Sequence, residues 1–165
     1  MKAKNIEYRI LNIEERGQSL FELVLSVGIS ALIIVVLVSL VNNALQNAAF
    51  SRNETLASKY SQAATEWLRG QRDSRIDTFI SNARSSPSSW CLRDVPLSDT
   101  SWNLHNACTS SQTITNTPFT RQVNFTVRTV SGKTIVNAEV RVAWTDSKGT
   151  HAVTSSTDFS DWRQR

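Results

Sequence analysis

The chain has 165 residues, a formal net charge of +4 and five glycines. Setting aside the first 50 residues leaves 115, which is enough for one small domain. The bases beyond residue 50 are scattered among acids instead of gathering on one element, so nucleic acid is not expected as the primary ligand.

A short charged leader precedes a long apolar segment. Residues 23–41 form a run of 19 residues without a charged residue or a proline, close to the ~20 that one helix needs to cross a hydrocarbon core. The small residue Gly17 lies before this run, whereas a secretory signal carries its small-residue cleavage site after its apolar region. By itself, this order predicts an uncleaved signal anchor with its leader in the cytoplasm.

The sequence GQSLFE at residues 17–22, followed directly by the apolar run, resembles the cleavage and methylation motif of type IV pilins and type II secretion pseudopilins. In that motif a glycine precedes the new N-terminus, and a glutamate occupies the fifth mature position, here Glu22. This chain departs from the common family pattern at two positions. Gln18 stands where phenylalanine is usual, and Ser39 stands where major pilins carry a proline.

The resemblance implies a precursor that is cut and then polymerised. A prepilin peptidase and methyltransferase would cleave after Gly17 and methylate the new amino group of Gln18. The chain would be a single-pass cell membrane protein with an extracytoplasmic head. An inner-membrane assembly platform would then pass it into a cell-surface or periplasmic helical filament of pilin-like subunits. Glu22 would pair there with the N-terminus of a neighbouring subunit.

The position of Glu22 agrees with this family but leaves an alternative open. A carboxylate within an apolar segment costs a few kcal/mol and is usually paired, although Glu22 could also reach the membrane interface, since it lies near the end of the run. The competing hypothesis is a single-pass anchor that presents an extracytoplasmic binding or adhesin module and does not polymerise.

Beyond residue 41 the apolar residues recur at helical spacing, and no proline occurs before Pro87. We therefore expect one unbroken helix from about residue 19 to about residue 82, apolar all round in its first half and amphipathic in its second. The stripe that would pack on the rest of the domain consists of Leu45, Ala49, Leu56, Tyr60, Ala63 and Trp67.

Residues 85–118 are rich in serine, threonine and asparagine and read as a loop. They contain both cysteines, Cys91 and Cys108, and in an exported domain such a pair favours a disulfide. The alternative is a metal site of these two cysteines and His105, which offers three ligands at most and lacks the paired spacing of structural zinc. We expect the disulfide, no metal and no cofactor.

From residue 120 the apolar residues alternate, predicting three strands near residues 123–127, 135–144 and 151–159. An antiparallel meander with one apolar face needs a cover, and the amphipathic half of the helix is the available one.

The expected fold is α+β, with a long N-terminal helix packed on an antiparallel sheet of three or four strands. The expected domains are a leader (1–17), an apolar transmembrane and assembly helix (18–50) and a pilin-like head (51–165). Within the head we expect helix at 51–82, the disulfide loop at 85–118 and the sheet at 120–160.

The chain does not read as an enzyme. Its two histidines, His105 and His151, have no serine or cysteine nucleophile in a recognisable elbow, and there is no glycine-rich loop that could cradle a phosphate. We expect a structural subunit without catalytic residues.

Overall fold

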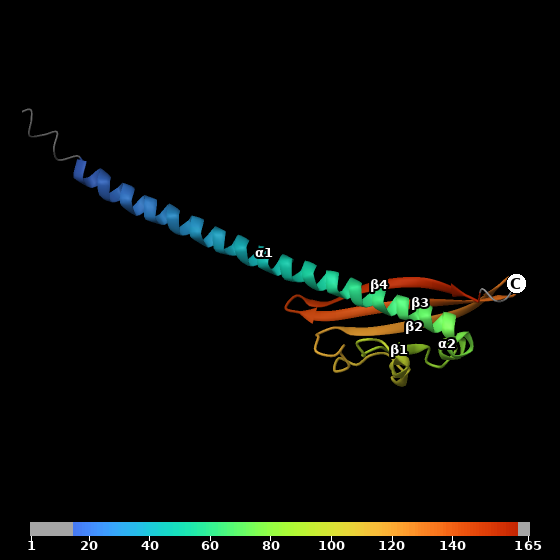
Figure 1. The fold of residues 1–165 in the computed structure, drawn as a ribbon. Coiled ribbons are helices and arrows are strands. Elements are labelled where there is room, and N and C mark those ends of the chain that lie inside the picture. Colours follow the sequence, from blue (N-terminus) through green and yellow to red (C-terminus); the bar gives the residue numbers. More distant parts are fainter. Residues whose placement is uncertain (1–14, 162–165) are drawn as a thin grey trace, which may run out of the picture. The chain divides into compact units, whose positions relative to one another are not determined.

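A computed structural model describes residues 15–161, with side chains from residue 20 onward. Figure 1 shows an α+β arrangement in which helix lies against an antiparallel sheet, as expected. The chain divides into an N-terminal unit, Met1–Ala49, and a second unit, Phe50–Arg165, which we call the head. The elements are α1 (Glu15–Ser74), α2 (Ile76–Ala83), β1 (Ser89–Cys91), the 3-10 helix η2 (Asp99–Asn103), β2 (Thr120–Val130), β3 (Lys133–Asp146) and β4 (Gly149–Ser160).

The sheet has four strands in the order β1-β2-β3-β4, and all neighbours are antiparallel. The predicted meander is confirmed as β2, β3 and β4. The turn between β2 and β3 places Ser131 at φ 51° and Gly132 at φ 78°, the two positive values of the hairpin turn that matches strand twist. The short β1 adds the fourth strand, with Trp90 opposite Val123.

Within the head, mostly small residues form the face of α1 that is buried. The buried positions are Ala57, Ser61, Ala64, Thr65 and Leu68. The stripe expected from the sequence is therefore confirmed only in part. Leu56, Tyr60 and Trp67 are half-buried and pack against the core, whereas Ala63 is exposed, and the centre of the buried face lies about one residue further along the helix. Small side chains let a helix backbone approach its neighbours closely, and the larger ones then flank the contact. A sequence prediction that looks for large apolar residues at helical spacing therefore selects the flanking residues and misses the small ones between them.

The predicted unbroken helix is also wrong at one point, because α1 ends at Ser74 and α2 begins at Ile76. Arg75 between them has φ −143° and ψ 62°, outside the helical region. The Ser74 hydroxyl donates to the Gly70 carbonyl at 2.7 Å, a local bond of the kind that bends helices. The Arg75 side chain reaches Asp99 at 2.5 Å, so a contact distant in sequence also favours the interruption.

The core of the head lies between the helices and one face of the sheet. Phe79 of α2 packs edge-on against Phe125 of β2 and Phe159 of β4, with ring centroids 5.7 and 5.4 Å apart. The other fully buried large apolar side chains are Leu68, Leu92, Ile114, Phe119, Val123, Val136, Val140 and Val142. The opposite face of β2 and β3 carries polar residues, as the alternation predicts.

The disulfide between Cys91 and Cys108 is present, with Cα atoms 4.9 Å apart. It ties β1 to the loop that follows η2. Beside it, the Trp90 ring packs on the rings of Trp102 and His105, with centroids 5.2 and 4.5 Å away. The predicted loop is thus held by a covalent bond and by aromatic packing.

Candidate functional site

The N-terminal unit presents an apolar surface with no cover from the side chains that the structure describes. From residue 20 to residue 49 every side chain is exposed. Sixteen large apolar side chains between Leu20 and Val41 are 51% to 70% exposed. Monomeric soluble proteins rarely expose apolar patches above a few hundred Å², so this surface requires an apolar environment.

The length of the segment suits two such environments. By length and composition, α1 is able to span a membrane once. Residues 23–41 correspond to about 28 Å of helix. Covering one Val, Leu, Ile or Phe side chain stabilises by about 1.5–3 kcal/mol, so sixteen of them provide a driving force of tens of kcal/mol. Lipid tails or an apolar surface of another protein would each provide such cover.

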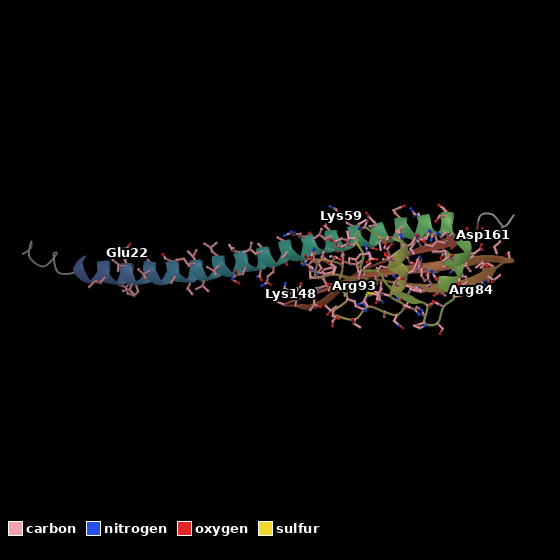
Figure 2. All side chains as sticks on the ribbon, turned by 60° about the horizontal axis from the view of Figure 1, so that its bottom comes forward. Glu22, Lys59, Arg84, Arg93, Lys148 and Asp161 are labelled. Carbon is pink, nitrogen blue, oxygen red and sulfur yellow. A yellow bond between two sulfur atoms is a disulfide. The ribbon has the colours of Figure 1, made fainter. Side chains whose placement is uncertain are left out.

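Glu22 is the acidic residue of this surface, and Figure 2 labels its side chain on the N-terminal part of α1. Among the side chains described from residue 20 onward, none forms a hydrogen bond or an ion pair with it. The nearest polar side chain one turn later is Ser26, whose hydroxyl donates instead to the Leu23 carbonyl at 2.9 Å. Any partner of the Glu22 carboxylate therefore lies outside the side chains that the structure describes.

The residues predicted to be processed can be placed only in part. Gly17 and Gln18 lie in the first turn of α1, so the backbone of the motif is helical there. The side chain of Gln18, and residues 1–14 of the predicted leader, lie outside the described residues. Cleavage after Gly17 and methylation of Gln18 stay predictions.

Small residues interrupt the bulk of the apolar segment. Gly28 has open space around the position of a Cβ atom. The Ser30 hydroxyl donates to the Ser26 carbonyl at 2.7 Å, so neither serine hydroxyl needs a partner outside the helix. Ser26 and Ser30 share one side of α1 because they are four residues apart, while Gly28 lies on the other side. Both sides permit close approach of a neighbouring helix.

The metal site weighed from the sequence is not formed. Both cysteine sulfurs are in the disulfide, and the part of the chain that the structure describes holds no group of three or more His, Cys, Asp or Glu residues suited to a metal. His105 Nε2 contacts the Ser85 hydroxyl at 3.1 Å, and His151 Nε2 contacts Asp146 Oδ1 at 3.0 Å. Both histidines therefore have local structural partners.

Sequence reasoning missed Arg121, a buried cation in the head. Its side chain is 2% exposed, and the hydrogen bonds described for it go to backbone carbonyls and not to a carboxylate. Nε donates to the Leu92 carbonyl at 3.1 Å, and the two terminal nitrogens donate to the carbonyls of Tyr60 and Asp94 at 3.3 and 2.8 Å. Burial lowers the pKa of Arg121 to about 10, so the side chain stays charged at neutral pH.

A signal for Arg121 exists in the sequence. Arg121 lies two and four residues before Val123 and Phe125, the inward-facing residues of β2, and alternate residues of a strand point to the same face. The three side chains share the face of the sheet that packs on the helices.

Comparisons of this chain with protein-family models, with curated proteins and with solved structures found no match.

Proposed function

We propose that this protein is a pilin-like structural subunit of a type IV pilus or a type II secretion pseudopilus, processed after Gly17 and assembled through its apolar helix. The observation that carries the proposal is a carboxylate, Glu22, without a described partner at the start of a helix whose sixteen large apolar side chains are exposed. The motif at residues 17–22 supplies the missing partner, because cleavage creates a positively charged amine at Gln18.

Pairing of that amine with Glu22 of a neighbour explains both features together. When helices associate through their apolar surfaces, the carboxylate loses water, and an opposite charge at 4 Å contributes about 4 kcal/mol at an effective dielectric constant of about 20. Gln18 and Glu22 are four residues apart, which is about 6 Å along a helix. A neighbour displaced by that distance along the axis brings its amine level with Glu22. Apolar association provides the affinity, and the charge pair selects this offset.

Processing is tested by mass spectrometry of the purified full chain from cells with and without a prepilin peptidase. We expect the peptidase to remove residues 1–17, leaving Gln18 as the N-terminus. Gly17→Ala should accumulate as precursor, whereas a plain membrane anchor would tolerate the change. A wild-type protein that keeps Met1 in the presence of an active peptidase would refute the proposal and favour the anchored binding module.

Assembly is tested separately with Glu22→Gln, which keeps the shape of the side chain and removes its charge. We expect normal cleavage but incorporation into filaments lowered by at least about tenfold, as expected for loss of a charge pair worth more than 1.4 kcal/mol. The matched control is Glu54→Gln, since Glu54 is an exposed carboxylate of α1 within the head. Equal incorporation of the two variants would show that Glu22 has no pairing role.

A further inference from the structure

A pocket lies on the polar face of the sheet, where that face meets the loop held by the disulfide. Its volume is about 500 Å³, within the range of about 300–1,000 Å³ that is typical of small-molecule sites. The loop contributes residues 108–110, and the sheet contributes Thr120 of β2, Arg141 and Thr145 of β3, and Thr150 of β4. Three strands and a loop therefore build one concave site in the head.

The pocket carries one positive charge, that of Arg141. This side chain is exposed, and the residues opposite it on the neighbouring strands, Gln122 and Thr154, are neutral. None of the lining residues is acidic. Glu139 lies on the same face two residues earlier on β3, outside the lining residues, and among the described residues no hydrogen bond or ion pair involves the Arg141 guanidinium. A ligand in this pocket would therefore find a cation with all of its donors available.

Hydroxyl groups surround this charge. Thr145 and Thr150 share one hydrogen bond of 3.1 Å between their hydroxyl oxygens. Since each hydroxyl has one donor and two acceptor positions, one O–H donor of the pair is left for a ligand. The Ser110 hydroxyl also lines the pocket and has no partner among the described residues. The pocket can thus donate hydrogen bonds to an oxygen-rich ligand and accept them from it.

The loop wall is held in place without a ligand. Cys108 is bonded to Cys91. The Thr109 N–H donates to Gln112 Oε1 at 2.9 Å, and the Gln112 N–H donates to the Thr109 carbonyl at 3.0 Å. A wall fixed in this way reduces the ordering cost of binding.

We propose that this pocket binds a ligand with one carboxylate and several hydroxyl groups, as a terminal uronic acid of a polysaccharide presents them. The Arg141 guanidinium would hold the carboxylate through two parallel hydrogen bonds, and the threonine and serine hydroxyls would bind the hydroxyls of the sugar. A monoanion matches the single charge that lines the pocket. The proposal is independent of filament assembly, because all of the lining residues belong to the head.

The experiment is saturation-transfer NMR on the full-length chain in zwitterionic phosphatidylcholine nanodiscs, with empty nanodiscs as the blank. The probe is methyl β-D-glucuronide at pH 7. Methyl β-D-glucoside has nearly the same shape without the charge, and cyclohexanecarboxylate has the charge without the hydroxyls. We expect saturable binding of the glucuronide, about tenfold weaker binding of the glucoside, and weaker binding of cyclohexanecarboxylate.

Variants assign the binding to this pocket. Arg141→Gln should lower glucuronide binding to the level of the glucoside, because it removes the charge that distinguishes the two probes. The matched control is Arg84→Gln, since Arg84, labelled in Figure 2, is exposed and lies outside the lining residues. Thr150→Val keeps the shape of a lining side chain without its hydroxyl and should weaken binding of the glucuronide. Thr126→Val, at an exposed position of β2 outside the pocket, should leave it unchanged.

Four results would each overturn the proposal. The first is the absence of saturable glucuronide binding by the wild-type chain, and the second is equal binding of the glucuronide and the glucoside. The third is a preference for the glucuronide that survives Arg141→Gln. The fourth is an equal loss of binding in Arg84→Gln and Arg141→Gln, which would indicate attraction to the overall charge of the head instead of a site.

Discussion

Replacing the buried cation of the head, Arg121→Met, tests how the structure accommodates a charge in its core. Methionine has similar length and fills similar space, so the main loss is of hydrogen bonds. The Leu92 and Asp94 carbonyls lose the donor described for them, at about 1–3 kcal/mol each. The Tyr60 carbonyl lies within α1 and keeps its helical partner. Removing a desolvated charge offsets part of the cost, so we expect the free energy of unfolding to fall by about 3 kcal/mol.

The assay is chemical denaturation of the full chain followed by tryptophan fluorescence. All five tryptophans lie beyond residue 50, so the signal reports on the head. The matched control is Arg141→Met on β3, because Arg141 is exposed and lies on the opposite face of the sheet. We expect a change within about 0.5 kcal/mol there. If Arg121→Met were as stable as wild type, or if the two variants lost equal stability, the reasoning about buried carbonyls would be refuted.

Two further predictions concern the loop region. Replacing both Cys91 and Cys108 by serine should lower the free energy of unfolding by about 3 kcal/mol, because the bridge closes a loop of sequence separation 17; denaturation of the variant against the oxidised wild type measures it, and equal stability would contradict the loop-closure account. The second prediction concerns Asp99, whose pKa is lowered from 3.8 by a hydrogen bond from Gln71 and then by Arg75. A lowered carboxyl pKa stabilises the fold above the unfolded value, and that contribution is lost as the pH falls through the folded pKa. Asp99→Asn should therefore be less stable than wild type at pH 7, with the difference closing in acid below pH 3.8; a difference that persisted there would contradict the prediction.

Local patterns were sufficient for the elements that carry strong periodicity. The strands β2, β3 and β4 follow from alternation and turn residues, because a half-buried strand exposes every second side chain. The disulfide followed from the two cysteines and from the exported setting that the sequence predicts. The strand β1 was not predicted, because its three residues, Ser89–Cys91, are too few to show an alternating pattern. It forms a strand by pairing with β2. The end of α1 at Ser74 was not predicted either, because the contact between Arg75 and Asp99 joins parts of the chain that are distant in sequence.

The sequence by itself determined the apolar run, its length, the motif at residues 17–22 and the place of Glu22, because these depend on the order and chemistry of neighbouring residues. Only the tertiary structure decided which face of α1 is buried in the head, that Arg121 is enclosed by three carbonyls, and that Ser110 and Arg141 line one pocket. These features arise where segments far apart in sequence pack together. Close packing requires small residues where two segments meet, and a buried charge needs carbonyls from distant segments. Neither requirement is visible in the spacing of apolar residues along one segment.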